Sequence, residues 1–217
     1  VVKAITLQTD GKILVGGLLY APDFYYGSVV RLNSNGSVDA GFSSPVYEQV
    51  NVISLQADGK ILVGNGTYYE RYTYMAGKKI ERLNTNGSVD AGFSYYFDID
   101  NLNQNVYALA VQADGKIVAA GSLYNSPNFD FAVVRYKPDG TLDNSFSEDG
   151  ITSTDFNAGN DVARCVKIQP DGRIVVAGYS YNASGYDFAV ARYNSNGTSD
   201  YSFSSDGRVT INILGKN

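Results

Sequence analysis

The sequence predicts an all-β protein of the β-propeller type, built from four tandem four-stranded antiparallel blades. Three observations lead to this prediction. A short motif, Gln-x-Asp-Gly-Lys/Arg-Ile, occurs four times, and Asp-Gly and Asn-Gly dipeptides, which favour β-hairpin turns, recur in each copy. No window of the sequence has the apolar period and caps of a helix. Units of about fifty residues with four short strands are typical of propeller blades.

The four copies of the motif are spaced along the whole chain. The Asp of the motif lies at positions 10, 58, 114 and 171, so successive copies are 48, 56 and 57 residues apart. Four such periods account for all 217 residues and leave nothing for a second domain. We therefore expect one repeat domain, residues 1–217, with blades at about 1–48, 49–104, 105–160 and 161–217.

The first two strands of each unit flank the Asp-Gly turn. In the first unit the strand at 4–7 precedes the turn, and Ile13–Val15 returns beside it. Asp-Gly between two such runs predicts a two-residue type I′ hairpin. Strands near a propeller axis have little room, and the aligned first-strand positions are all small or β-branched: Ala4, Val52, Ala108 and Cys165. Cys165 is therefore expected to be a small buried core residue.

The third and fourth strands of each unit are marked by an Arg, an Asp and a Phe. In all four units the Asp follows the Arg by eight residues and the Phe follows the Asp by three. The third strand ends at an Asn-Gly or Asp-Gly turn, and the fourth strand is expected around the Phe. The Arg and the Asp then lie on the two arms of one hairpin, where they can form an ion pair. Because a catalytic pair would occur once, this recurrence predicts a structural clasp. The clasp pairs are Arg31 with Asp39, Arg82 with Asp90, Arg135 with Asp143, and Arg192 with Asp200.

Three stretches in the second half of the chain carry a family resemblance. Residues 169–178 read Gln-Pro-Asp-Gly-Arg-Ile-Val-Val-Ala-Gly, residues 187–193 read Asp-Phe-Ala-Val-Ala-Arg-Tyr, and residues 138–146 read Pro-Asp-Gly-Thr-Leu-Asp-Asn-Ser-Phe. This pattern resembles the delta-60 repeat, a tandem unit of large bacterial proteins that are often secreted or surface-exposed. The resemblance covers all four units, closely in the third and fourth and more loosely in the first and second. It implies a β-propeller-like architecture and a secreted or cell-surface location in bacteria, with no assigned activity and no site residues.

The composition excludes several classes of function. With 17 Lys and Arg against 22 Asp and Glu, the net charge is −5, so we expect no nucleic-acid partner. No stretch approaches the roughly 18 consecutive apolar residues of a membrane helix, and no membrane insertion is expected. Without His the chain has no Ser-His-Asp triad and no imidazole metal site, and its single Cys cannot form an internal disulfide. We expect no enzymatic activity and no cofactor.

Carboxylates are the remaining candidates for chemistry, because paired acids could run a glycosidase or lyase without His. This enzyme alternative predicts that two non-repeating acids, for instance Glu70 and Asp98, lie within about 10 Å of each other. No spacing singles out two of the acids outside the repeated pattern. These acids are Asp23, Glu48, Glu70, Asp98, Asp100, Asp155 and Asp161. The acids and amides of the recurring turns invite a calcium interpretation, but their spacing does not fit an EF-hand loop, so no metal site is predicted.

Tyrosines crowd the loop expected between the second and third strands of each unit. In a four-stranded blade this loop lies at the end opposite the short Asp-Gly and Asn-Gly turns. Varied loops on a rigid scaffold suit binding, and Tyr offers a large contact area at little cost in entropy. Tyr is also a strong strand former, so these residues could equally be ordinary cross-strand partners. The candidate binding residues are Tyr20, Tyr25, Tyr26, Tyr68, Tyr69, Tyr72, Tyr74, Tyr124, Tyr179, Tyr181 and Tyr186.

These observations favour a non-catalytic, secreted or cell-surface module that binds a protein or a carbohydrate at its Tyr-rich face, as in adhesion. One alternative is a structural building block of a larger extracellular assembly, whose first and last blades expose apolar patches and meet further blades or a second chain. The carboxylate-dependent glycosidase or lyase is a second alternative. Four blades are compatible with a closed ring and with a segment of a larger propeller.

Overall fold

A computed structural model describes residues 1–21, 24–46, 48–66, 68–70, 73–75, 80–93, 105–156, 159–182 and 185–212; for strand residues 19–21, 24–27, 68–70 and 73–75 it describes the backbone alone. The chain forms two compact units, Val1–Tyr95 and Tyr96–Asn217. Within the described residues, the strand pairs are antiparallel. No helix in this part of the chain is long and apolar enough to cross a membrane.

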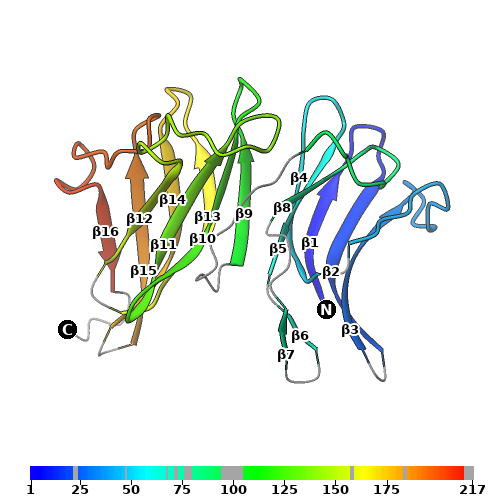
Figure 1. Cartoon of the computed structure of the whole chain (residues 1–217), viewed down its shortest axis with the longest axis horizontal. Helices are drawn as coiled ribbons and strands as arrows, with labels where there is room; N and C mark the ends of the chain where they lie inside the picture. Colours follow the sequence, from blue (N-terminus) through cyan, green and yellow to red (C-terminus); the bar gives the residue numbers. More distant parts are fainter. Residues whose placement is uncertain are drawn as a thin grey trace. The chain divides into compact units, whose positions relative to one another are not determined.

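The first unit is built from short antiparallel sheets (Figure 1). One three-stranded sheet has the order β1 (Val2–Leu7), β2 (Ile13–Ala21) and β3 (Phe24–Leu32). A second has the order β4 (Val50–Leu55), β5 (Ile61–Asn65) and β8 (Ile80–Leu83). Between β5 and β8, a separate hairpin pairs β6 (Tyr68–Glu70) with β7 (Thr73–Met75). In the described residues these two sheets therefore show three of the four predicted strands.

The second unit contains two four-stranded sheets. One consists of β9 (Asn105–Val111), β10 (Ile117–Asn125), β11 (Asn128–Tyr136) and β12 (Ile151–Thr154). The other consists of β13 (Asp161–Ile168), β14 (Ile174–Asn182), β15 (Gly185–Tyr193) and β16 (Arg208–Ile211). In both sheets, strands that follow one another in sequence are neighbours, which is the meander of a propeller blade. The structure thus confirms the predicted all-β, propeller-type fold class.

The Asp-Gly turns close the first two strands, but not as the predicted two-residue hairpin. In the first sheet, the backbone N–H of Gln8 donates to the carbonyl of Lys12 at 2.8 Å, so three residues form the loop. Gly11 N donates back to Gln8 O at 3.0 Å, and Gly11 has a φ of 81°. A type I′ turn needs positive φ at both central residues, whereas Asp10 keeps a negative φ. The prediction of type I′ was wrong: each turn is a type I turn followed by a left-handed Gly.

The recurring Phe lies in a turn and not, as predicted, on the fourth strand. Phe146 N donates to Asp143 O at 2.9 Å, so its backbone donor closes a turn and is lost to sheet pairing. Strand β12 starts after this turn, at Ile151, and β16 starts in the same way after Phe203. The fourth strand of these two sheets is therefore displaced toward the C-terminus of the repeat.

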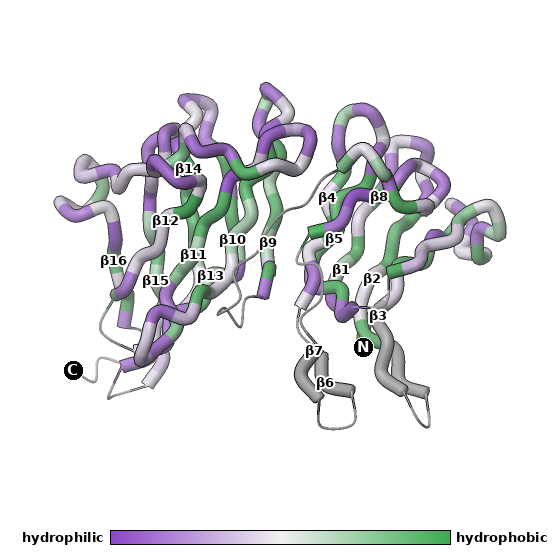
Figure 2. Tube along the Cα trace, in the orientation of Figure 1, coloured by the Kyte–Doolittle hydropathy of each residue, from purple (hydrophilic) through white to green (hydrophobic). Residues whose placement is uncertain are grey.

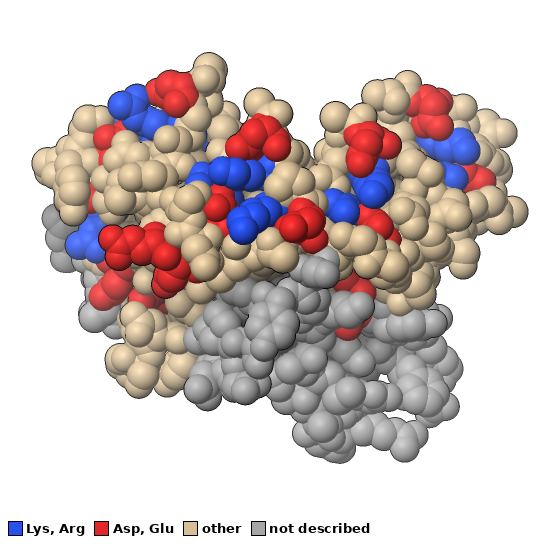
Figure 3. Space-filling view, turned by 45° about the horizontal axis from the view of Figure 1, so that its top comes forward, with Lys and Arg blue, Asp and Glu red and all other residues tan. Residues whose placement is uncertain are grey.

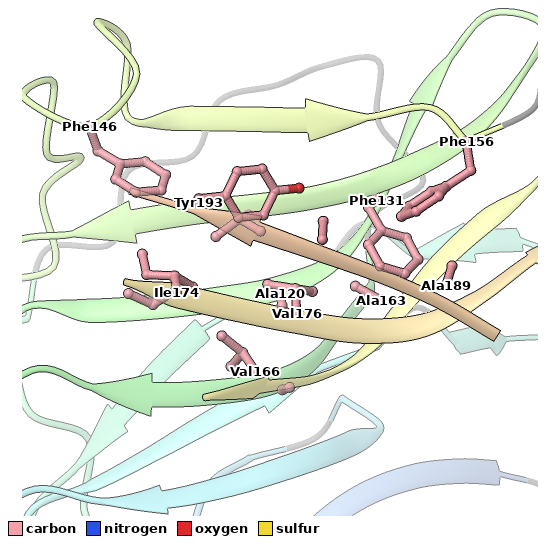
Figure 4. Close-up of a cluster of buried hydrophobic side chains, with 14 residues drawn as sticks. Ala120, Phe131, Phe146, Phe156, Ala163, Val166, Ile174, Val176, Ala189 and Tyr193 are labelled. Carbon is pink, nitrogen blue, oxygen red and sulfur yellow. The ribbon is translucent and has the colours of Figure 1, made fainter. Parts of the chain in front are cut away.

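The core of each unit lies between its two sheets. In the second unit, Phe131 and Phe156 meet edge to face with ring centroids 4.8 Å apart, beside Ala163 of the next sheet (Figure 4). Apolar residues run along these strands while hydrophilic residues gather in the turns (Figure 2). In the first unit, the corresponding core consists of Leu14, Val29, Val46, Val50, Ile53, Ile61, Val63 and Leu83. Burial of apolar side chains at about 25 cal/mol per Å² is the main stabilising contribution of these contacts.

Hydrogen bonds also join the two sheets of each unit at the end where the turns lie. In the second unit, Arg135 Nη1 donates to Ser195 O at 2.5 Å, and Ser147 N donates to Asn196 O at 2.7 Å. Gly197 lies under Phe146, and a Cβ at this glycine would lie 2.9 Å from the ring. The first unit repeats the pattern with Arg31 Nη1 to Thr85 O at 2.5 Å and Ser43 N to Asn86 O at 3.1 Å.

Cys165 is exposed, contrary to the prediction that it is a core residue. Its counterpart Ala108 is buried because that face of β9 packs against the next sheet of the unit. On the last sheet the same face carries Cys165 opposite Ala177 and, two residues along β14, Tyr179 opposite Phe188. We call this the outer face of the last sheet. Phe188 is 55% exposed there.

Candidate functional site

The clasp pairs lie at the turn end of each sheet, with Arg and Asp in contact in all four repeats. The Arg Nε to Asp Oδ2 distances are 2.8 Å for Arg31–Asp39, 2.7 Å for Arg82–Asp90, 2.8 Å for Arg135–Asp143 and 2.7 Å for Arg192–Asp200. Each guanidinium also lies over the recurring Phe of its own repeat, 4.6 to 4.9 Å from the ring centroid. The Phe thus belongs to the clasp, which gives the third member of the spaced triplet a physical role.

A second basic residue enters each clasp and was missed by the sequence analysis. It is the Lys or Arg that directly follows Asp-Gly in the motif: Lys12 reaches Asp39 at 2.8 Å, and Lys60 reaches Asp90 at 2.8 Å. In the second unit, Lys116 lies 3.2 Å from Asp143, and Arg173 lies 3.1 Å from Asp200. The constant basic residue at this motif position was the available signal. In Figure 3, basic and acidic side chains accordingly lie next to one another in small groups.

These contacts keep the clasp carboxyl groups ionised. Hydrogen bonds from Lys12, Gly41 and Arg31 lower the pKa of Asp39 to about 2. Burial alone would raise the pKa of Asp143, but hydrogen bonds from Ser145 and Lys116 lower it to about 2. The same constellation occurs four times and every charge in it is paired, so no single clasp stands out from the others.

The predicted binding tyrosines lie at the opposite end, on paired strands where the sequence analysis placed a loop. Strands β2 and β3 stay paired to Ala21 and Phe24, which places Tyr20 opposite Tyr25 and Leu19 opposite Tyr26. On the β6–β7 hairpin, Tyr69 lies opposite Tyr74 and Tyr68 opposite Met75, while Tyr72 is outside the described residues. In the second unit, Tyr124 lies on β10, Tyr179 and Tyr181 on β14, and Tyr186 on β15.

Four aromatic residues gather on the outer face of the last sheet, and we call them the aromatic surface: Tyr179, Tyr181, Tyr186 and Phe188. Tyr181 pairs with Tyr186 and Tyr179 with Phe188 across β14 and β15. The ring of Tyr186 lies 5.2 Å from that of Tyr179 and 5.0 Å from that of Tyr181. Tyr186 is 71% exposed and Tyr181 is 43% exposed. Cross-strand packing fixes these rings while leaving much of their area open to solvent.

Arg164 extends this surface toward the first sheet of the same unit, a contact that sequence reasoning missed. Its guanidinium lies 3.9 Å from the ring centroid of Tyr107 on β9 and 5.6 Å from that of Tyr179. Burial raises the pKa of Tyr107, so its hydroxyl stays protonated. The repeat pattern gave no signal for Arg164, because it lies at an irregularity of the β13–β14 register. The surface thus offers ring faces, hydroxyl groups and one cation.

In the sheet formed by β9 to β12, another sheet follows, so its aromatic residues show which positions of the last sheet such a neighbour would bury. Phe131, the counterpart of Phe188, is fully buried against the next sheet. At the hairpin tip, Tyr124 and Phe129 pack at 5.3 Å, and Tyr124 stays 39% exposed although another sheet follows. Tyr181 and Tyr186 occupy the equivalent tip positions of the last sheet. The tip is therefore a position that stays accessible, whereas Phe188 lies where a neighbouring sheet would pack.

Most of the acids offered for a glycosidase pair are not placed by the structure. Asp23, Asp98 and Asp100 lie outside these residues, and only the backbone of Glu70 is described, so the pair Glu70 and Asp98 is not placed. Asp155 and Asp161 do come together, with Asp130, and one carboxylate oxygen from each lies within 4.8 Å of the other two. Glycosidase carboxyl groups stand about 5 to 9.5 Å apart around an open site, whereas Asp130 and Asp161 are buried. This group suits a cation better than a sugar.

Three segments of the chain match a family described as "Domain of unknown function (DUF5122) beta-propeller". They are residues 8–42, 112–146 and 169–203, so each runs from the Gln of the motif to the recurring Phe of its clasp. The repeat that begins at Gln56 lies outside the matched segments. The chain therefore contains three repeats of this propeller type, and a comparison with curated protein sequences finds no match.

Solved structures resemble the chain in fold. A protein of unknown function from Dyadobacter fermentans DSM 18053 is similar with a TM-score of 0.59 and 12% identity, over 96% of this chain and 64% of that one. A structure described as a glycoside hydrolase is similar with a TM-score of 0.52 and 12% identity, over 99% of this chain and 52% of that one. The chain thus spans between half and two thirds of these proteins. At such identities the likeness shows the fold alone.

Proposed function

We propose that the chain is a non-catalytic, secreted or cell-surface binding module of the propeller type, which contacts a protein or a carbohydrate through its aromatic surface. The observation that carries this proposal is the cluster of Tyr179, Tyr181 and Tyr186 at an exposed hairpin tip. Exposed large aromatic groups in contact with one another are characteristic of interaction sites. The rigid strands that carry them reduce the entropy lost on binding.

A protein partner is favoured over a carbohydrate. The rings of Tyr179 and Tyr186 are perpendicular, and those of Tyr181 and Tyr186 are tilted by 58°. The rings therefore do not form one flat platform on which a sugar ring could stack. Tyrosines with an arginine beside them match the residue types that dominate the energetics of protein interfaces. A carbohydrate is the second arm of the test.

The test is a binding screen of the purified chain against two panels, one of immobilised glycans and one of purified cell-surface proteins. Tyr186→Ser removes the most exposed ring of the aromatic surface and is expected to weaken binding at least about tenfold. The matched control is Tyr201→Ser, because Tyr201 is equally exposed, at 72%, but lies in the turn beside the clasp residue Asp200. We expect this control to bind like the wild type.

The panel that responds identifies the ligand class. Binding that Tyr186→Ser and Tyr201→Ser reduce equally would contradict the proposed surface, as would the absence of any ligand in both panels. Hydrolysis or elimination of a glycan in the same screen would replace the binding module by the enzyme alternative.

The location and the repeat type complete the proposal. The resemblance of the motif to the delta-60 repeat supports a bacterial protein that is secreted or displayed on the cell surface. The matched propeller segments coincide with the same motifs, from the Gln to the Phe, which supports a delta-60 assignment of the repeats. Localisation of the tagged parent protein by cell fractionation tests this part.

A second candidate function, a building block of a larger assembly, is favoured by two exposed apolar faces. On β1, Ile5 is 66% and Leu7 is 70% exposed, whereas Val166, the counterpart of Ile5 on β13, is 4% exposed because it packs against the preceding sheet. On the last sheet, Phe188 is exposed where Phe131 is buried. These faces correspond to the two halves of the sheet-to-sheet interface that each unit already contains. The occupant we propose is a sheet of a second copy of the chain.

Light scattering over a range of concentrations tests this second candidate. We expect association of the wild type and its loss in Phe188→Ser and in Leu7→Ser, which remove apolar area from the two faces. A chain that stays monomeric at every concentration would contradict it. Because Leu7 lies on β1, outside the aromatic surface, Leu7→Ser tells loss of assembly apart from loss of ligand binding.

A further inference from the structure

Three acidic side chains converge where the first sheet of the second unit meets the start of the last sheet. Asp130 lies on β11, Asp155 follows β12, and Asp161 is the first residue of β13. One carboxylate oxygen from each of the three residues lies within 4.8 Å of the other two. The chain thus brings three carboxylates together from positions up to 31 residues apart in sequence.

Two of these carboxylates are buried with one oxygen unpartnered. Asp130 is 2% exposed and Asp161 is 0% exposed. Asp130 Oδ2 accepts a hydrogen bond from Asn125 Nδ2 at 2.9 Å, and Asp161 Oδ2 accepts one from Phe156 N at 2.8 Å. The Oδ1 atoms of both residues are buried and accept no hydrogen bond of normal geometry within the described part of the chain, although the Ser180 hydroxyl lies near Asp161 and favours its ionised form. A buried carboxylate oxygen without a partner is destabilising unless a proton or a cation satisfies it.

One basic side chain, Arg208, lies beside the group and donates a hydrogen bond to the backbone carbonyl of Asp155. Among the described residues, no Lys or Arg forms an ion pair with Asp130 or Asp161. Burial raises the pKa of both groups, and the charge of Asp155 raises both further. Ionising both buried acids beside Asp155 is therefore unfavourable unless a cation joins them.

The ligand set selects the class of cation. Calcium prefers oxygen ligands at about 2.3 to 2.6 Å, so two ligand oxygens of one ion can lie at most about 5 Å apart. The three carboxylates fall within this limit. Magnesium needs shorter bonds in a stricter octahedron and keeps its water, and zinc prefers nitrogen and sulfur ligands.

We propose that Asp130, Asp155 and Asp161 bind a calcium ion, which ties the end of the β9–β12 sheet to the first residue of β13. The exposed Asp155 would close the site toward solvent, and the unpartnered oxygens of Asp130 and Asp161 would be the ligands on its buried side. The ion would stabilise the junction between two consecutive sheets without taking part in the aromatic surface.

The repeat supplies an internal comparison for this site. Asp187 is the counterpart of Asp130 on the last sheet, and it accepts the same hydrogen bond, from Asn182 Nδ2 at 2.6 Å. Among the described residues, however, Asp187 is not part of such a group of three acids. The Asn–Asp hydrogen bond therefore belongs to the repeat, and the convergence of three carboxylates does not.

The experiment is a calorimetric titration of the full chain with calcium chloride after removal of metal by a chelator, with thermal unfolding measured in parallel. We expect one calcium per chain, and a melting temperature that rises by about 5 °C in about 5 mM calcium and less in magnesium. Asp155→Asn, an exposed substitution that keeps the size of the side chain, is expected to weaken calcium binding at least about tenfold. Asp161→Asn is the second variant, and Asp187→Asn is the matched control that should bind as the wild type does.

Each result of the calcium titration either supports or overturns the proposed site. Calcium binding that is lost in Asp155→Asn and kept in Asp187→Asn supports the site, and it does so even if Asp161→Asn does not fold. Absence of calcium heat and of a melting shift in the wild type would overturn it, and the buried carboxyl groups would then be held protonated. Calcium binding that Asp155→Asn and Asp161→Asn both retain undiminished would also overturn it.

Discussion

The two ends of the sheets differ in what is repeated. At the turn end, the same Arg, Asp, Phe and basic residue meet in four repeats at nearly the same distances. At the opposite end, where β10 turns into β11 and β14 into β15, no such repetition is seen in the described residues, and we call it the hairpin end. There the aromatic surface occurs on the last sheet, and the three acids occur between the two sheets of the second unit. We interpret the repeated interactions as those that hold each sheet, and the unrepeated ones as the places where this chain differs from its own scaffold.

Acid should protonate the clasp carboxylates of every repeat and so weaken all four clasps together. This is the largest effect on stability that we expect. The pKa of Asp39, Asp90 and Asp143 is about 2 in the folded chain, below the usual value of 3.8. The stability that these groups add is therefore complete above their unfolded pKa and is lost as the pH falls through about 2. Urea unfolding should show a midpoint that falls steeply below about pH 4. A midpoint unchanged down to about pH 2 would contradict the role of the clasps.

A single clasp substitution separates the two ends directly. Asp143→Ala leaves the buried guanidinium of Arg135 without its carboxylate, and we expect a loss of about 3 kcal/mol in the free energy of unfolding. At the hairpin end, Asp187→Ala removes one hydrogen-bonded acid and should cost about 1 kcal/mol. Denaturant unfolding of both variants measures the difference. Equal losses would mean that the turn end has no special place in stability.

Gly197 and Gly36 occupy the same position in equivalent turns, but only Gly197 contacts a neighbouring sheet. Alanine substitutions at the two positions therefore measure how much that contact contributes to stability. Gly197 and Gly36 have φ of 92° and 84°, so alanine strains the backbone at both by about 1 kcal/mol. A Cβ at Gly197 would also lie 2.9 Å from the Phe146 ring, whereas a Cβ at Gly36 meets nothing within 4 Å. We expect Gly197→Ala to cost about 1 to 3 kcal/mol more than Gly36→Ala. Thermal unfolding checks this, and a larger loss at Gly36 would contradict the packing described for the second unit.

The smallest expected effect on stability lies at the aromatic surface itself. Tyr186→Ser removes a ring that is 71% exposed, so the free energy of unfolding should fall by less than about 1 kcal/mol. Denaturant unfolding beside the wild type is the measurement. A loss as large as that of Asp143→Ala would mean that the aromatic cluster is a structural element of the sheet and not a surface held available for a ligand.

Repetition explains how much could be predicted from the sequence. The fold class followed from the four motifs, and the contact of Arg with Asp followed from their constant spacing on one hairpin. The partner Lys12 was visible in the same motif but was not recognised, because it joins the clasp from a different hairpin. The turn type was misjudged because Asp-Gly suits both a type I′ turn and a type I turn with a following glycine.

Features that depend on one tertiary contact could not be predicted. Arg164 reaches Tyr107 across two sheets, and no local pattern encodes that approach. Asp130 looked like a member of the repeat, since Asp187 occupies the equivalent position, and only the fold places it beside Asp155 and Asp161. Cys165 was expected in the core because its counterparts are small, yet burial there depends on whether another sheet of the unit covers that face.

The measurement that tests the central claim most directly is the affinity of two variants, Asp143→Asn and Tyr186→Ser, for the ligand found with the wild type, at a temperature where both are folded. If the turn end is scaffold and the hairpin end is the contact surface, Tyr186→Ser binds at least about tenfold more weakly, and Asp143→Asn binds within about twofold of the wild type. The opposite result, with binding lost in Asp143→Asn and kept in Tyr186→Ser, would contradict the account and move the functional surface to the clasps.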